Sequence, residues 1–366
     1  MSCNNHFLSP MSLDKTTVSV LTPPGRGAVA TILVSGQLDA LRQRAEDTGS
    51  PFFIAKNGLP IEKQTLHRIV FGSWGDEELV ICRTAEECLE IYSHGGQQAV
   101  TRIMQSLVES GAEQINWESS VDKQSESWLA DYHKALSSCS TERTAELLLL
   151  QMHHGASFWS RLQLGTVSTD ELTIARKWAR FGQHLVTPWE VVIGGPPNVG
   201  KSSLINRLLG YERAIVFDQP GTTRDVVSAD TAIDGWPVRF SDTAGQRQTC
   251  DALETKGISY AIAKFQQADL QILVFDQSLQ PDDFTLSLMA EFPEAILLYH
   301  KSDLPMNSEW HRIKFPSTPL PVSSITGDGI QKVLAEISAR LVPVLPPEEV
   351  VYPISERQRN LLKQKI

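Results

Sequence analysis

One segment constrains the fold of this chain more than any other, Gly195-Pro-Pro-Asn-Val-Gly-Lys-Ser202. It follows the short apolar stretch 191–193 and precedes a helical pattern that begins at Ser203. A glycine-rich loop of spacing GxxxxGK[ST] between a strand and a helix is typical of a phosphate-binding loop. The glycines let backbone N–H groups turn toward phosphate oxygens, and the helix N-terminus adds a favourable field. We therefore predict a nucleotide site at the end of a parallel strand.

Two side chains of this loop carry chemistry. Lys201 is predicted to reach the β- and γ-phosphates, and the Ser202 hydroxyl is predicted to bind magnesium. The alternative is an accidental glycine turn before a helix. The strand–loop–helix order around the motif argues against that alternative.

Two later segments follow in the order expected of a GTPase around its metal. Gly221-Thr-Thr-Arg-Asp225 supplies a switch threonine, Thr223, whose hydroxyl can bind magnesium when the γ-phosphate is present. Asp242-Thr-Ala-Gly245 ends a predicted strand. This places the Asp242 carboxylate near the metal and the Gly245 N–H near the γ-phosphate.

Two further segments predict the base that is bound. His300-Lys-Ser-Asp303 ends a later strand, and Asp303 can accept from guanine N1 and N2, a donor pattern that adenine lacks. Ser323-Ser-Ile325 ends the last strand, where a backbone N–H can meet guanine O6. The ends of parallel strands are where open α/β sheets bind ligands. The chain is therefore predicted to bind GTP.

The rest of the chain predicts several domains. After residue 188, apolar strands at 191–193, 272–275 and 295–298 alternate with helical stretches, which indicates a parallel sheet with helices on both faces. Residues 17–115 contain short apolar segments such as 28–34 and 67–71, separated by Gly, Pro and Asn. Residues 119–140 suit a linker or exposed helices.

A helical region is predicted from Thr141 to Val186, and a short helix from Ser355 to Ile366. Ser168 followed by Glu171 predicts a capping box within the longer region.

Composition excludes several classes of protein. Hydrophobic residues make up 41% and charged residues 21% of the chain, which is an ordinary globular balance. The net charge of −10 means that any contact with nucleic acid needs a local basic patch. Five cysteines without a CxxC pair, and nine histidines without HExxH spacing, predict reduced thiols and no structural zinc. With no apolar run long enough to span a bilayer and no secretory signal, we expect a cytoplasmic protein that does not contact membranes.

Three segments together resemble the MnmE (TrmE) family of bacterial tRNA-modifying GTPases. They are Thr22-Pro-Pro-Gly-Arg-Gly27, Leu89-Glu-Ile-Tyr-Ser-His-Gly-Gly96 and the GTPase segments with Gly195-Pro-Pro-Asn-Val-Gly-Lys-Ser-Ser203. The resemblance implies a multidomain α/β protein. It implies an N-terminal α+β folate-binding-like dimerisation domain at 1–118 and a shortened helical domain at 119–187. It also implies a P-loop GTPase domain at 188–345 and a residual helical segment at 346–366.

The resemblance further implies an activity, cofactors and partners. The family hydrolyses GTP with magnesium when two GTPase domains meet around potassium, and it dimerises through its N-terminal domain. A flavin-containing partner (MnmG) and a one-carbon folate, 5,10-methylene- or formyl-tetrahydrofolate, then help to modify the wobble uridine of certain tRNAs.

Several family positions map onto this sequence. Asn198 matches the P-loop asparagine that binds potassium, whose charge stands where other GTPases place an arginine finger. Thr222, with the backbone at Phe217 and Gln219, completes the potassium site. Glu254 aligns with the glutamate that orients the attacking water indirectly, although a solvated helix carboxylate is its bland alternative.

Two positions depart from the family in the GTPase segments. His300 replaces the asparagine of the NKxD motif, and its imidazole can bond to the P-loop backbone or to guanine N7. We expect weaker guanine binding, with specificity kept through Asp303. Gln246 stands where the family has an apolar residue. It either orients the hydrolytic water directly or is an exposed side chain in a switch.

The folate region and the C-terminus depart further. Glu90 matches the folate-contacting carboxylate, but Leu33 stands where the family has an arginine. The chain stops at Ile366 and has no cysteine after Cys250, whereas the family ends in more helices and an FCIGK signature. We therefore expect the modification chemistry to be reduced or lost. The alternatives are an active uridine-34 modification GTPase with a flavoprotein partner, and a non-hydrolysing nucleotide-binding assembly factor.

The predicted residues form three sets. The catalytic set is Lys201, Gly245, Gln246 and Glu254. The magnesium ligands are Ser202 and Thr223, and the potassium ligands are Asn198, Phe217, Gln219 and Thr222. The nucleotide contacts are Asn198, Val199, Gly200, Lys201, Ser202, Ser203, Phe217, Thr222, Thr223, Asp242, Gly245, His300, Lys301, Asp303, Ser323, Ser324 and Ile325.

Overall fold

The computed structural model describes residues 15–23, 27–124, 126–211, 228–242 and 263–364. The chain forms two compact units, Met1–Ala130 and Asp131–Ile366. Among the described helices, none is both long and apolar enough to cross a membrane. The predicted domain boundaries at 118, 187 and 345 stay predictions.

The first unit is built on a seven-stranded sheet of order β3-β4-β5-β6-β2-β1-β7. Every neighbouring pair is antiparallel except β1 with β7, which is parallel. The strands are β1 (Thr17–Val20), β2 (Val29–Ser35), β3 (Phe53–Ala55), β4 (Ile69–Trp74), β5 (Glu77–Ala85), β6 (Cys88–His94) and β7 (Glu113–Gln114).

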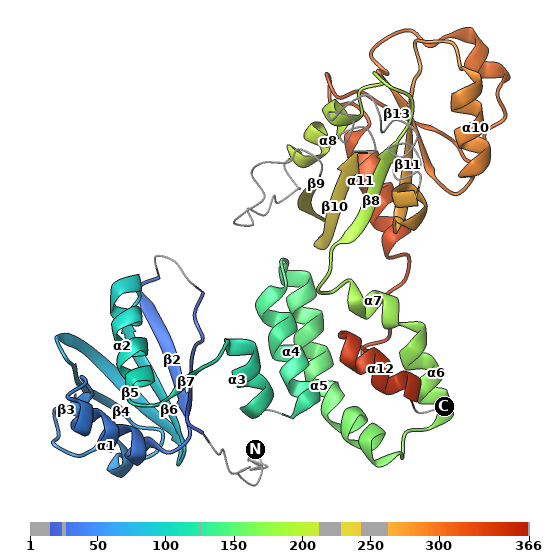
Figure 1. Cartoon of the computed structure of the whole chain (residues 1–366). Coiled ribbons are helices and arrows are strands. Elements are labelled where there is room, and N and C mark those ends of the chain that lie inside the picture. The colour runs from blue at the N-terminus through green and yellow to red at the C-terminus, as the bar shows by residue number, and fades with distance from the viewer. Residues whose placement is uncertain (1–14, 24–26, 125, 212–227, 243–262, 365–366) are drawn as a thin grey trace, which may run out of the picture. The chain divides into compact units, whose positions relative to one another are not determined.

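Two helices cover one face of this sheet (Figure 1). They are α1 (Leu38–Thr48) and α2 (Gln97–Glu109), and a 3₁₀ turn η1 (Ile61–Lys63) lies between β3 and β4. Alternate residues of the central strands, such as Ile32 and Ile91, pack in one apolar core with Leu107 of α2. A third helix, α3 (Trp117–Gln124), contacts β1.

The second unit begins with helices, as the sequence predicts for residues 141–186. They are α4 (Ser127–Ser138), whose first four residues precede the unit boundary, α5 (Glu142–Leu164), α6 (Thr169–Lys177) and α7 (Ala179–Gln183), joined by α12 (Glu356–Gln364) from the end of the chain. Gln151 of α5 donates to the Val350 carbonyl at 2.8 Å and accepts from the Tyr352 N–H at 3.2 Å. This amide therefore anchors the segment that leads into α12. The expectation of a linker or exposed helices at 119–140 is wrong for α4, because Trp128, Ala130, Tyr132 and Ala135 are buried.

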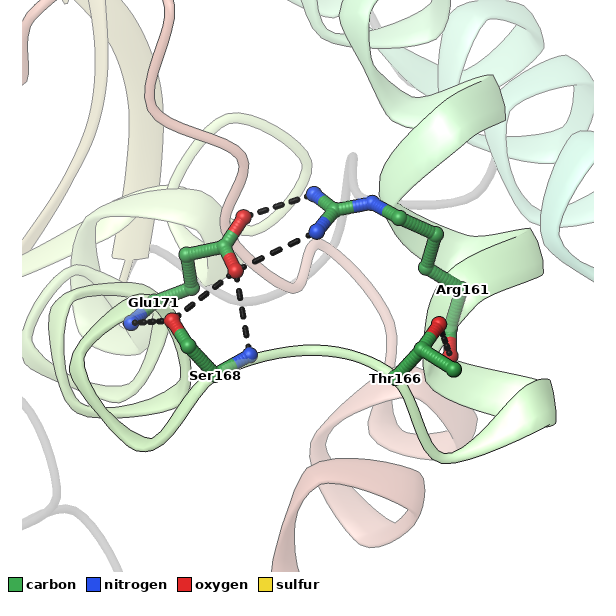
Figure 2. Close-up of polar contacts among 4 residues, drawn as sticks. All are labelled: Arg161, Thr166, Ser168 and Glu171. Atoms are coloured by element: carbon green, nitrogen blue, oxygen red, sulfur yellow. Dashed lines mark hydrogen bonds and ion pairs between the residues drawn. The ribbon is translucent and has the colours of Figure 1, made fainter.

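The predicted capping box is confirmed at the start of α6 (Figure 2). The Glu171 N–H donates to Ser168 Oγ at 3.2 Å, and Glu171 Oε2 accepts from the Ser168 N–H at 3.0 Å. Arg161 of α5 adds two hydrogen bonds to the same carboxylate, at 2.6 and 3.2 Å. The guanidinium and the cap donors lower the pKa of Glu171 to about 2. The cap thus ties α6 to the end of α5.

The sheet of the second unit has six strands in the order β13-β12-β11-β8-β10-β9. All pairs are parallel except β9 with β10. The strands are β8 (Trp189–Gly194), β9 (Ser228–Ile233), β10 (Trp236–Asp242), β11 (Leu270–Asp276), β12 (Ile296–His300) and β13 (Leu320–Val322). This confirms the predicted strands at 191–193, 272–275 and 295–298.

Helices bury both faces of this sheet. One face packs Leu273 and Phe275 against Met289 of α10 (Asp283–Glu291) and Trp310 of the 3₁₀ turn η2 (Ser308–Arg312). The alternate residues, such as Ile272, are fully buried as well. The helices α8 (Lys201–Leu209) and α11 (Ile330–Leu341) contact each other, and they contact β10 and β11 respectively. Two buried faces explain why these strands read as continuous apolar runs rather than as alternating ones.

The turn between β9 and β10 is hydrogen-bonded to Arg143 of α5. Asp234 and Gly235 both have positive φ (51° and 77°), as a two-residue hairpin turn requires. Arg143 donates to the Asp234 carbonyl at 2.7 Å and to its carboxylate at 3.0 Å, and its guanidinium lies 4.2 Å from the ring centre of Trp236. Ser338 of α11 donates to the same carboxylate at 3.2 Å.

Candidate functional site

The loop between β8 and α8 has the backbone shape that its glycines predict. Gly195 and Gly200 have φ of +136° and +99°, and Asn198 between them has φ of +61°. A Cβ atom on Gly195 would lie 2.3 Å from the Val274 carbonyl oxygen, so no larger residue fits there. The loop ends at the first turn of α8, whose free N–H groups favour an anion. This geometry suits a phosphate.

Lys201 is held inside this loop. Its Nζ donates to the carbonyl oxygens of Gly195 and Pro196 at 3.0 and 2.8 Å, and the residue is only 6% exposed. The two bonds span the loop from its last residue to its first ones. The ammonium therefore lies where the loop closes around a phosphate group.

The predicted metal residues Ser202 and Asp242 are in contact. Ser202 Oγ donates to Asp242 Oδ2 at 2.9 Å, although the two residues are 40 positions apart. The contact arises because β10 pairs in parallel with β8, with Asp242 opposite Ile193, and so ends beside the loop. A hydroxyl and a carboxylate are the hard oxygen donors that Mg²⁺ prefers, with substrate phosphates and water completing its shell. The pair therefore fits magnesium, and the described residues contain no group of three or more His, Cys, Asp or Glu that could hold another metal.

The guanine side of the site is built from the ends of β12 and β13. Asp303 is exposed, and its Oδ1 accepts from Ser323 Oγ at 2.5 Å. Ser323 is fully buried and its Oγ also accepts from the N–H groups of Ile325 and Thr326, both at 3.2 Å. These bonds hold the predicted base-reading carboxylate against the turn that is predicted to meet guanine O6.

His300 joins the two sides of the site. The residue ends β12 and is 2% exposed. Its Nδ1 lies 2.6 Å from the Val199 carbonyl oxygen in the P-loop, and its Nε2 lies 3.0 Å from Ser324 Oγ. Of the two contacts considered from the sequence, the one with the P-loop backbone is thus present. Burial is the main cause that lowers the pKa of His300.

Lys301 has a partner that the sequence analysis missed. Its Nζ donates to Asp276 Oδ2 at 2.6 Å, and Asp276 is the last residue of β11. Burial alone would raise the pKa of Asp276, but hydrogen bonds from Lys301 and Ser278 outweigh it and hold the pKa low. The position of Asp276 at the end of a parallel strand was the available signal, because β11 lies between β8 and β12.

The chain is similar in sequence to several known GTPases. Residues 190–301 match the family described as 50S ribosome-binding GTPase. The tRNA modification GTPase MnmE of Acinetobacter baumannii (strain AYE) is 31% identical over 337 residues, which cover 78% of this chain and 71% of that protein. The MnmE of Acinetobacter baylyi is 29% identical over 409 residues, covering 97% and 86%. The G domain of the FeoB iron transporter of T. maritima is 25% identical over 42% of this chain and 99% of that chain, with a TM-score of 0.30.

The chain belongs to the MnmE family of tRNA modification GTPases. It is accordingly a GTP hydrolase that binds GTP and Mg²⁺, and its function is related to tRNA modification. The P-loop GTPase fold and the multidomain α/β class are both as predicted from the sequence.

Part of the predicted site lies outside the described residues. This applies to the switch, potassium and water-orienting positions, namely Phe217, Gln219, Thr222, Thr223, Gly245, Gln246 and Glu254. The other predicted residues are all described. Asn198 is exposed at the top of the P-loop, Ser203 lies in the first turn of α8, and Ile325 is 78% exposed.

The family's folate position has a different environment in this chain. Leu33 lies directly opposite Glu90 across β2 and β6, and Cys82 lies opposite Glu90 on its other side. Leu33 is 5% exposed. Tyr92, two residues along the same strand, donates a hydrogen bond to Glu90 Oε2, and this bond is the main cause that raises the pKa of Tyr92 to about 12.

The turn after β6 approaches the end of the segment 22–27. The Gly95 N–H donates to the Ala28 carbonyl at 3.1 Å. A Cβ on Gly95 would lie 1.9 Å from the Gly27 carbonyl oxygen, so glycine is required. His94 Nδ1 lies 2.5 Å from a carboxylate oxygen of Glu77. The two family segments of the N-terminal domain are therefore neighbours in space.

Proposed function

We propose that this protein cleaves the γ-phosphate of GTP at the loop between β8 and α8, and that this hydrolysis drives a switch in tRNA metabolism. The observation that carries the proposal is the 2.9 Å bond between Ser202 and Asp242, which joins two predicted magnesium contacts from distant segments. Lys201 stabilises charge on the phosphates, and Thr223 and Gly245 respond to the γ-phosphate.

The attacking water is assigned to two candidate residues. Glu254 orients it indirectly in the family pattern, and Gln246 can orient it directly. In the proposed scheme potassium binds at Asn198 with Phe217, Gln219 and Thr222, and its charge offsets the charge that develops on the phosphates. Because the side chain of Asn198 is exposed, a cation can reach it from solvent.

We further propose that the tRNA modification chemistry is reduced. The supporting observation is the row across the N-terminal sheet, in which Glu90 faces a buried Leu33 and is bonded to Tyr92. A buried leucine supplies no hydrogen bond to the charged end of a folate. The alternative is an active uridine-34 enzyme, which would act as a dimer with a flavoprotein partner, tRNA and a tetrahydrofolate. A non-hydrolysing assembly factor is set aside because the chain is a GTPase.

Replacing Asp303 by asparagine tests where guanine binds. The amide repels the N1 and N2 donors of guanine but can donate to the O2 of xanthine. We expect GTP affinity to fall on the order of 100-fold and xanthosine triphosphate to become the better ligand, because two hydrogen bonds to a charged acceptor are lost. Equilibrium titration with both nucleotides measures this exchange. Unchanged preference for GTP would place the base elsewhere.

A further inference from the structure

Both ring nitrogens of His300 are already engaged within the protein. The Nδ1 contact is with a main-chain carbonyl, Val199 O, and the Nε2 contact is with a hydroxyl, Ser324 Oγ. A carbonyl oxygen can only accept a hydrogen bond, so Nδ1 carries a proton. Nε2 then accepts from the Ser324 hydroxyl when the ring is neutral.

The surroundings keep the ring neutral and fixed. His300 is 2% exposed, and burial disfavours the imidazolium and lowers its pKa. Lys301 adds to this effect, whereas the Val199 hydrogen bond, Asp276 and Asp303 oppose it. The ring also lies close against the P-loop, because a Cβ on Gly200 would lie 2.5 Å from His300 Cε1. A Gly200 side chain would therefore push the ring out of place.

A neutral imidazole has one N–H, whereas the amide of asparagine has two. An amide at this position could donate one hydrogen to Val199 O and the other to the N7 acceptor of guanine. The single N–H of neutral His300 already donates to the Val199 carbonyl oxygen. The hydroxyl of Ser324 is also engaged, since it donates to Nε2.

We infer that His300 determines how this GTPase reads guanine: it fastens the P-loop to the Ser324 turn and offers no donor to guanine N7. Recognition of the base then rests on Asp303 at N1 and N2 and on the backbone of residues 323–325 at O6. The inference depends on the proposed placement of guanine beside Asp303. It predicts that nucleotides altered at N7 are accepted.

The test compares GTP with 7-deaza-GTP, in which carbon replaces N7 and the Watson–Crick edge is unchanged. We expect the wild-type protein to bind the two with dissociation constants within about twofold of each other, measured by competition against a fluorescent GDP. In His300→Asn we expect a preference for GTP of about three- to tenfold, the value of one hydrogen bond. A wild-type preference above threefold overturns the inference. An asparagine variant without preference also overturns it, because residue 300 would then not reach N7.

A second measurement needs no variant. In the ¹⁵N NMR spectrum of the wild-type protein with GDP and Mg²⁺, His300 should show a pyrrole-type Nδ1 and a pyridine-type Nε2. Two protonated nitrogens, or the opposite tautomer, overturn the inference.

The Asp303→Asn titration separates the two levels of the argument. If that variant exchanges guanine for xanthine but the wild type rejects 7-deaza-GTP, only the role of His300 fails. If the variant keeps its preference for GTP, the placement of guanine fails first.

Discussion

The phosphate end of the GTPase sheet and the Glu90 row of the N-terminal sheet (Ser19, Leu33, Glu90 and Cys82) are held together in different ways. At the phosphate end the contacts join distant segments, such as Ser202 with Asp242 and His300 with Val199. In the Glu90 row, the hydrogen bond to Glu90 comes from Tyr92 on the same strand. A bond between distant segments exists only in the correctly folded sheet, so it reports a built site. A bond between side chains two positions apart on one strand can form without any partner strand.

The difference is also one of charge and burial. The phosphate end gathers Lys201, Asp242 and Asp276 with low exposure and partners of opposite or polar character. The Glu90 row alternates apolar or weakly polar residues around one carboxylate, and burial is the main cause that raises the pKa of the Cys82 thiol. The first region is organised for an anion and a cation together. The second offers one carboxylate already bonded to a phenol.

The largest effect is expected from Lys201→Ala. Removing the ammonium that is bonded across the P-loop should lower GTP turnover by about 100-fold or more, because the phosphates lose a positively charged contact. Phosphate release assays measure this loss. Lys332→Ala on the exposed side of α11 is the matched lysine control and should keep full turnover. Unchanged turnover in Lys201→Ala would mean that this end of the sheet is not the phosphate site.

Potassium should act on the same region with a smaller effect. Turnover of the wild-type protein should rise on the order of tenfold when sodium is replaced by potassium, because the potassium ion that we propose at Asn198 would offset developing charge on the phosphates. Asn198→Ala should respond to neither ion. Equal rates of the wild type in both salts would mean that another group, such as Gln246, has replaced the cation.

A titration of Tyr92 tests the Glu90 row. Because the Glu90 carboxylate raises the pKa of Tyr92 to about 12, Glu90→Gln should bring that phenol back toward its ordinary 10.0. The sign follows from the charge, since a carboxylate beside the hydroxyl opposes formation of the phenolate. Ultraviolet absorbance of the phenolate against pH, with Tyr92→Phe subtracted, measures the change. An unchanged titration curve would mean that Glu90 does not raise the pKa of Tyr92.

The smallest expected effect is none at all. Calorimetric titration with formyl-tetrahydrofolate should give no saturable heat, while GDP with Mg²⁺ in the same preparation does. Saturable tight binding of the folate would instead favour the active modification enzyme. The Glu90 row would then be a binding site, like the phosphate end.

The sequence predicts those parts of the site that depend on local spacing. The GxxxxGK[ST] loop and Asp242 at the end of its strand are both present in the structure, as are Asp303 and the turn at Ser323. Each follows from a strand end and a short motif. The type of sheet was also predictable, because alternating strands and helices favour a parallel sheet.

The contacts between strand ends could not be predicted in the same way. The Lys301–Asp276 pair depends on β11 lying beside β12, and the choice between P-loop and base for His300 depends on the depth of its burial. Burial was also missed in α4, because Trp128 and Tyr132 are embedded in a polar stretch whose average composition suggests an exposed helix. Average composition conceals which side of a helix packs.

The contact of Arg143 with the β9–β10 turn joins α5 to the strand that ends at Asp242. Strand β10 spans Trp236–Asp242, so about 20 Å of extended chain separate this turn from the Asp242 carboxylate. The strand is hydrogen-bonded along both edges, to β8 and to β9. Helix α5 and Asp242 are thus linked through one hydrogen-bonded strand, and the link at its far end consists of two hydrogen bonds from Arg143 and one from Ser338 to two oxygen atoms of Asp234.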